Sequence, residues 1–200
     1  MTARDRDRRA EILAGAAALF AEKGVATTTV RELADAAGIL SGSLYHHFES
    51  KDHIVEEIVI SYVDDLRRGY DRALAEEQEP RARLVNLIRV SLEVAERHHG
   101  ATEIYLNELQ SLRSLPRYGT IRRARSAMRK AWIATIESGI QAGAFRSDLD
   151  PQVVYRLIRE AVWRSVRWYR PTAAYPVERF ASDCASIFLD GLTTPGPRVS

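Results

Sequence analysis

Two stretches of sequence decide the fold: TTVRELADAAG at residues 28–38 and GSLYHHFESK at residues 42–51. In the first, threonines precede an apolar-periodic run and a glycine closes it, an order that is typical of a short, capped helix. In the second, Leu44 and Phe48 are four residues apart, which predicts another short helix that begins near Ser41. Two short helices that are joined by a glycine-containing turn form the helix-turn-helix pattern.

Polar side chains cover the outer face of the second predicted helix, because Leu44 and Phe48 occupy the inner face. Hydroxyl, phenol and imidazole groups suit contacts with base edges and phosphates in a DNA groove. The candidate DNA-binding residues on this face are Ser41, Ser43, Tyr45, His46 and His47. The pattern alone leaves one alternative open, an ordinary helical hairpin with a polar outer face.

Helical spacing of apolar residues continues in both directions, and β-branched alternation is almost absent. An upstream helix is expected to end near Gly24, and Ser50 is an N-cap for a long helix that extends to about Glu77. The sequence therefore predicts an all-α fold of about nine helices without strands. Further helices are expected over approximately 84–95, 104–112, 121–143, 151–169 and 177–192.

This pattern predicts three parts of the chain. Residues 1–52 are expected to form the helix-turn-helix DNA-binding domain, and residues 53–192 a larger helical domain, for which the resemblance to a known family given below implies effector binding and dimerisation. Residues 193–200, with two prolines and a glycine, are expected to form a flexible tail.

The composition of the chain indicates the cellular compartment in which the protein is expected. The single cysteine, Cys184, cannot form an internal disulfide, and no cysteine–histidine cluster has zinc-ligand spacing. No apolar run approaches the ~20 residues needed to cross a bilayer, and the start of the chain lacks the apolar segment of a signal peptide. A cytoplasmic protein without metal or cofactor is therefore expected.

Charge alone does not identify a nucleic-acid binder. The chain has 29 Lys and Arg residues against 27 Asp and Glu residues, which gives a net charge of +2. Residues 1–52 hold seven basic and eight acidic side chains, a net charge of −1. The arginines between Arg4 and Arg9 leave two alternatives open, a DNA-contacting arm and a solvated, disordered terminus.

The two quoted stretches, together with LFAEKG at residues 19–24, resemble the N-terminal domain of the TetR family of repressors almost position for position. The resemblance implies that the helix that begins at Ser41 is the recognition helix in the major groove. It further implies that Tyr45 and Lys51 contact phosphates and that Thr28 contacts the DNA backbone. One position departs from the family: Leu40 stands where the family often has serine, which leaves the start of the recognition helix open.

The C-terminal part is similar to family members at AGAFR, residues 142–146, and at DLDP, residues 148–151. This similarity implies that the last two long helices pair with their counterparts in a four-helix dimer interface. The residues expected in this interface are Val154, Leu157, Ile158, Ala161, Ser165, Phe180, Cys184, Ile187 and Phe188.

A stripe of cations with one indole marks the helix that begins at Pro151. Its members, at helical spacing, are Arg156, Arg159, Trp163, Arg167 and Arg170. Guanidinium groups bind phosphates bidentately and an indole stacks on a purine, so the stripe suits an anionic ligand such as a coenzyme A (CoA) thioester. A solvated face or an interface rim is the alternative. Tyr105 and Trp132 are candidates for an apolar cavity beside it, with ordinary core packing as the alternative.

The WRSVRWYRP segment at residues 163–171 makes the whole chain similar to one group within the family, the actinobacterial repressors of cholesterol catabolism. That resemblance implies an effector that is a CoA thioester of a steroid ring-degradation intermediate. The alternatives are a regulator of fatty-acid or efflux genes with a hydrophobic ligand, and a helical interaction module. An enzyme is disfavoured, because the chain has no glycine-rich phosphate loop and no nucleophile motif.

Overall fold

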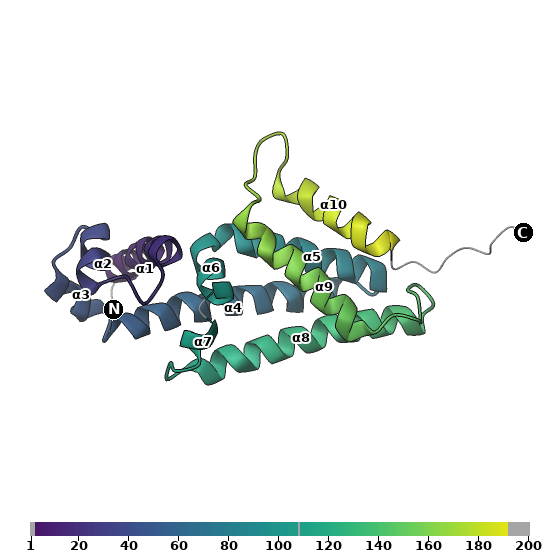
Figure 1. The fold of residues 1–200 in the computed structure, drawn as a ribbon, viewed down its shortest axis with the longest axis horizontal. Coiled ribbons are helices and arrows are strands. Elements are labelled where there is room, and N and C mark those ends of the chain that lie inside the picture. Colours follow the sequence, from purple (N-terminus) through teal and green to yellow (C-terminus); the bar gives the residue numbers. More distant parts are fainter. Residues whose placement is uncertain (1–2, 108, 192–200) are drawn as a thin grey trace, which may run out of the picture. The chain divides into compact units, whose positions relative to one another are not determined.

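The computed structural model describes residues 3–107 and 109–191, and every regular element within these ranges is helical, which confirms the all-α prediction (Figure 1). The chain divides into two compact units. The first combines Met1–Val63 with His98–Arg122, and the second combines Asp64–Arg97 with Arg123–Ser200. The predicted boundary at residue 52 stays a prediction, and the predicted tail lies outside the described residues. None of the described helices is both long and apolar enough to cross a membrane.

The first unit holds the helix-turn-helix. Its complete helices are α1 (Ala3–Lys23), α2 (Val30–Ala36), α3 (Ser41–His47), α6 (His99–Asn107) and α7 (Leu109–Leu112). The first part of α4 (Lys51–Glu76) also belongs to this unit, because the unit boundary falls within that helix. The predicted anchors Leu44 and Phe48 are each 2% exposed, as is Phe20 of α1. The apolar pattern of the sequence therefore identified this core correctly.

Two glycines and one threonine fix the turns around α2. Gly24 has a φ of +86° and Gly38 a φ of +63°, a left-handed backbone that a side chain would strain. Thr29 caps α2, and its side chain accepts a hydrogen bond from the backbone N–H of Glu32. Leu40 occupies the N-cap position of α3 without a side-chain cap, and the helix, whose start the Leu40 departure had left open, begins at Ser41.

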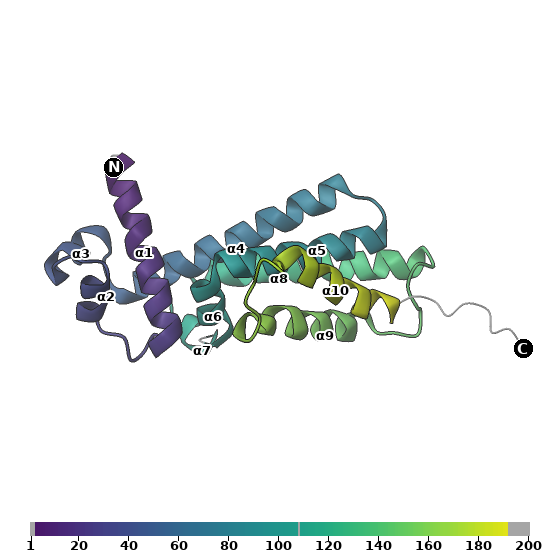
Figure 2. The ribbon, with the colours of Figure 1, turned by 90° about the horizontal axis from the view of Figure 1, so that it is seen from above.

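Three helices make up much of the second unit: α5 (Pro80–Arg97), α9 (Pro151–Arg164) and α10 (Val177–Asp190). Helix α10 packs along α5, and α9 also contacts α5 (Figure 2). Most of α8 (Tyr118–Gln141) lies in the same unit. Helix α9 begins at the predicted residue, 151. Asp150 caps it, since its carboxylate accepts from the N–H groups of Gln152 and Val153, and Pro151 takes the first helical position.

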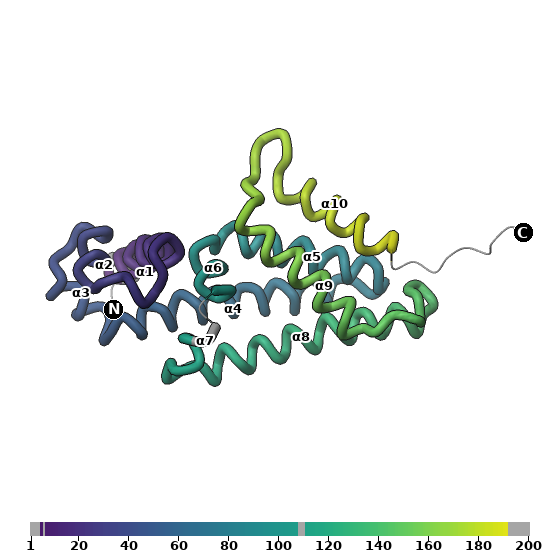
Figure 3. Tube along the Cα trace, in the orientation of Figure 1, coloured from purple at the N-terminus to yellow at the C-terminus, as the bar shows by residue number. Residues whose placement is uncertain are grey.

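One predicted boundary agrees with the structure and another is wrong. The helix expected over approximately 84–95 ends at Arg97, and after a turn at His98 the next helix, α6, begins at His99 (Figure 3). The helix predicted to extend to Tyr169 ends at Arg164, where a 3₁₀ turn, η1 (Ser165–Arg167), follows. Tyr169 N–H then bonds back to Ser165 O at 2.7 Å, and Pro171 prevents a continued helix.

Candidate nucleic-acid interface and effector site

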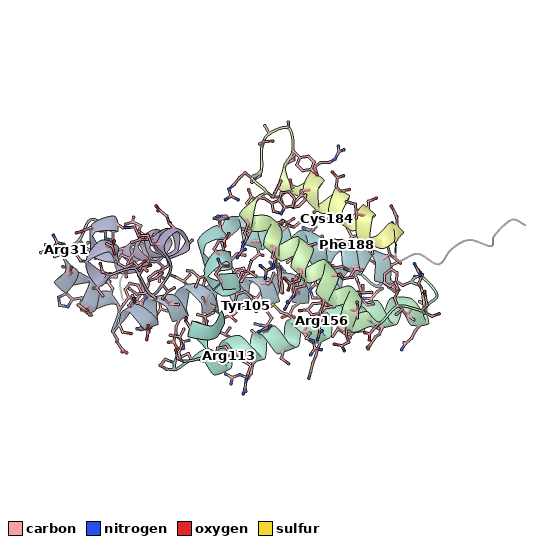
Figure 4. The ribbon with its side chains drawn as sticks, in the orientation of Figure 1. Arg31, Tyr105, Arg113, Arg156, Cys184 and Phe188 are labelled. Carbon is pink, nitrogen blue, oxygen red and sulfur yellow. The ribbon has the colours of Figure 1, made fainter. Side chains whose placement is uncertain are left out.

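The outer face of α3 is polar, as the sequence predicted. Tyr45 is 56% exposed, His46 is also exposed, and Leu44 beneath them is buried. Ser41, Ser43 and His47 are half-buried. Arg31 of α2 projects from the same domain into solvent (Figure 4). These residues lie on two adjacent short helices, which is the arrangement a helix-turn-helix uses to enter a groove.

Lys51 and Thr28 have partners within the domain. The Nζ atom of Lys51 donates to Val25 O at 2.8 Å and to Thr28 O at 3.0 Å. The hydroxyl of Thr28 is buried and donates to Gly24 O at 2.8 Å. Both side chains therefore stabilise the turn between α1 and α2. The Thr28 side chain is buried, and that of Lys51 is half-buried. Their predicted contacts with DNA stay predictions.

A network centred on Glu57 holds the end of α3 and was missed by the sequence analysis. Glu57 pairs with Arg9 of α1, and its Oε1 atom lies 2.9 Å from His53 Nε2. Arg9 also donates to the carbonyl of His47, the last residue of α3, and lies 4.0 Å above the ring of Phe48. Of the two alternatives left open for these arginines, a solvated, disordered terminus does not describe Arg9, because Arg9 takes part in the domain's own packing.

A capping box at the start of α2 is tied to α1 by an ion pair. Glu32 accepts from the Thr29 N–H at 2.8 Å and from Lys23 Nζ at 2.8 Å. The hydrogen bond from Lys23 and those from Thr29 lower the pKa of Glu32 from 4.5 to about 2. The carboxylate therefore stays ionised well below neutral pH.

The second unit contains the predicted pair on α9. The guanidinium of Arg159 lies 5.9 Å from the ring of Trp163, which is 5% exposed, and Arg159 also pairs with Glu160. Arg156 also lies on α9 and is exposed, but Arg167 and Arg170 do not continue this helical face, because α9 ends at Arg164. Arg167 lies in the 3₁₀ turn, and Arg170 donates to Val166 O at 2.6 Å.

The aromatic candidates belong to different units. Tyr105 lies in the first unit, where its ring centroid is 5.5 Å from that of Tyr62. Trp132 lies in the second unit, between Tyr70 at 6.0 Å and Tyr155 at 6.1 Å. Among the described residues, the buried Trp132 Nε1–H has no hydrogen-bond acceptor. An unpaired buried donor costs about 1–3 kcal/mol, so it is a group that a ligand oxygen can satisfy.

The predicted dimer residues divide into two sets. Leu157 is 62% exposed and Ile187 is 74% exposed, so α9 and α10 each present a large apolar side chain to solvent. Cys184 and Phe188 lie along α10 (Figure 4) and are half-buried. Other members face the core of the unit and cannot form an interface, which corrects the prediction for Val154, Ile158, Ser165 and Phe180. Burial raises the pKa of the Cys184 thiol to about 11, so this cysteine is protonated at neutral pH.

Comparisons with known proteins cover nearly the whole chain. Residues 12–58 match the bacterial regulatory proteins of the TetR family, and residues 77–192 match a tetracyclin repressor-like C-terminal domain. The HTH-type transcriptional repressor KstR2 of Rhodococcus jostii (strain RHA1) is 43% identical over 188 residues, 94% of this chain and 92% of that protein. KstR2 of Mycobacterium tuberculosis (strain ATCC 25618 / H37Rv) is 44% identical over 189 residues, 94% of each protein.

Solved structures agree with these relatives. The ketosteroid transcriptional regulator KstR2 of Mycobacterium tuberculosis has a TM-score of 0.89 at 44% identity, over 94% of this chain and 96% of that one. AibR, in complex with isovaleryl coenzyme A and operator DNA, has the same fold, with a TM-score of 0.78 at 21% identity over 90% of this chain and 97% of that one. The named relatives are transcriptional regulators rather than enzymes. The chain therefore belongs to the TetR family of bacterial regulatory proteins, as a helix-turn-helix transcriptional repressor related to KstR2.

Proposed function

We propose that this protein binds a palindromic operator as a homodimer and is released from it by a CoA thioester that arises in steroid ring degradation. The observation that carries the proposal is the similarity, over 94% of the chain, to repressors named KstR2, one of which is described as a ketosteroid transcriptional regulator. Repression of the genes beside the operator would then end when the thioester accumulates.

The DNA-binding half of the proposal depends on α3. Tyr45 and His46 are exposed on a helix whose other face is fixed by Leu44 and Phe48. One helix of seven residues buries little DNA surface, so a dimer on two half-sites supplies both affinity and the reading of symmetry.

The effector half depends on α9 and on Trp132. Arg159 supplies a cation, Trp163 an indole beside it, and Trp132 a buried N–H without an acceptor among the described residues. A CoA thioester offers phosphates, a carbonyl oxygen and an apolar acyl group to these three kinds of partner. A protein of the same fold, AibR, holds isovaleryl coenzyme A together with operator DNA.

Release follows if the thioester binds better to the form of the dimer that cannot span two half-sites. A ligand with equal affinity for both forms would shift nothing, however tightly it bound. The proposal therefore requires differential binding, and differential binding can be measured.

Fluorescence anisotropy of a labelled operator tests the proposal. Purified protein is first bound to the operator and then titrated with a steroid-derived acyl-CoA, with its free acid, and with a long-chain fatty acyl-CoA. Release by the steroid-derived thioester alone supports the proposal. Release by the free acid at equal concentration, or only by the fatty acyl-CoA, contradicts it.

A further inference from the structure

Helix α8 carries a strong excess of positive charge. It contains five basic residues, and its single acid, Glu137, lies near its C-terminal end. Three helical positions, Arg125, Arg129 and Trp132, share one face, because they are spaced i, i+4 and i+7. In the described part of the chain, neither Arg125 nor Arg129 pairs with a carboxylate.

This face of α8 contacts one face of α9. Gln152, Tyr155 and Arg159 are spaced i, i+3 and i+7 on α9. Arg129 donates a hydrogen bond to the amide oxygen of Gln152, and the rings of Trp132 and Tyr155 lie 6.1 Å apart. The two contacts bring these faces of α8 and α9 together next to Tyr155.

The electrostatics of Tyr155 support this arrangement. Burial raises the pKa of the phenol, and the positive charges of Arg159, Arg125 and Arg129 act in the opposite direction. The positive charges of three guanidinium groups therefore act on one buried phenol, and an anion bound between them would offset their mutual repulsion. Only Arg159 has a carboxylate partner, Glu160, which it shares with Arg164.

We propose that Arg125 and Arg129 of α8, with Arg159 of α9, form a binding site for the phosphate groups of the effector. The inference rests on the proposed function and extends it, because it assigns the phosphates to α8 and leaves the indoles of Trp132 and Trp163 for the remainder of the ligand. Guanidinium forks match phosphate oxygens in geometry and keep their charge at every physiological pH.

Calorimetry with two probes tests the site: free coenzyme A, which carries the phosphates, and pantetheine, which lacks them. The double variant Arg125→Met/Arg129→Met should weaken coenzyme A binding by at least about 10-fold, because two charge-assisted contacts are lost. The matched control is Arg123→Met/Lys130→Met, which removes the same charge from the opposite face of α8. It should bind coenzyme A as the wild type does.

Gln152→Ala is a second control, because it removes the hydrogen bond to Arg129 without removing charge. If Arg129 only braces α8 against α9, this variant will weaken coenzyme A binding as much as the double variant does, and the inference is overturned. Equal losses of coenzyme A affinity in both double variants also overturn the inference. So does a wild-type protein that binds pantetheine as tightly as coenzyme A, and so does one that binds neither probe.

The operator experiment tests the proposed function independently of the phosphate site. A wild type that binds coenzyme A through α8, but is not released from DNA by any thioester, refutes the proposed function and leaves the phosphate site standing.

Discussion

At the scale of single residues, substitutions of Tyr45 and Lys51 are expected to have different effects, although the family resemblance implies a phosphate contact for both. Tyr45 is exposed on α3, whereas Lys51 holds two backbone carbonyls of the α1–α2 turn. Tyr45→Ala should therefore weaken binding to operator and scrambled DNA equally, with no change in Tm, because phosphate contacts carry no base information. Lys51→Met should also lower the free energy of unfolding by about 1–2 kcal/mol. Thermal unfolding and anisotropy titrations check both, and an unchanged Tm for Lys51→Met would contradict the bracing role.

Glu57 provides a second prediction for a residue distant from the DNA face. Glu57→Gln should weaken operator binding about 5-fold, because Arg9 loses the carboxylate that orients it on the last turn of α3. Glu49→Gln is the matched control, since it changes the charge of the same domain by the same amount at an exposed position. Anisotropy titrations of both variants decide: if Glu49→Gln weakens binding as much, the network does not position α3.

A contact could be predicted from the sequence when its residues are close along the chain. Leu44 and Phe48 were evident from their spacing of four residues, because a helix brings such positions onto one face. A threonine cap for α2 was evident from the threonines before the apolar run, although the sequence did not single out Thr29. The Arg9–Glu57 pair joins residues 48 positions apart, and no local pattern marks it. Acids and bases are too frequent on helix surfaces for long-range partners to be chosen from the sequence.

At the scale of elements, the start of α2 should respond to acid. The pKa of Glu32 is lowered from 4.5 to about 2, so its contribution is complete above pH 4.5 and is lost as the pH falls toward 2. Glu32→Gln should lower Tm by about 1–3 °C at pH 7, a small effect because the pair is exposed. The difference from wild type should shrink at pH 3. Parallel thermal scans at both values measure it, and a difference that is constant with pH would show that Glu32 contributes only as a neutral cap.

Helix ends near a side-chain cap were predictable, and ends set by tertiary packing were not. Asp150 with Pro151 fixed the start of α9, as expected. Its end was placed five residues too late, because the 3₁₀ turn over Ser165–Arg167 has no cap residue or glycine to mark it. The error placed Arg167 and Arg170 on the predicted cationic face, whereas in the structure both lie beyond the end of α9. A wrong helix boundary therefore led to wrong residues in a predicted site.

At the scale of the whole molecule, the exposed apolar side chains of α9 and α10 predict a dimer. Ile187→Lys should give a monomer, because a charge replaces a side chain that is 74% exposed in the single chain. Operator affinity should fall more than about 100-fold, as binding through two linked half-sites is lost. Light scattering and anisotropy provide the two readouts. Ser182→Lys, on another face of α10, is the control, and a dimeric Ile187→Lys protein would place the interface elsewhere.

The uncapped start of α3 has a consequence for hydrogen exchange. Leu40 supplies no side-chain acceptor, and the first N–H groups of any helix lack partners within it. The amide protons of Ser41 and Gly42 should therefore exchange with solvent deuterium without waiting for the domain to open, whereas those of α1 exchange only through larger openings. If α3 enters the DNA groove as proposed, operator binding should slow exchange at these two amides, because DNA would then replace the water around them.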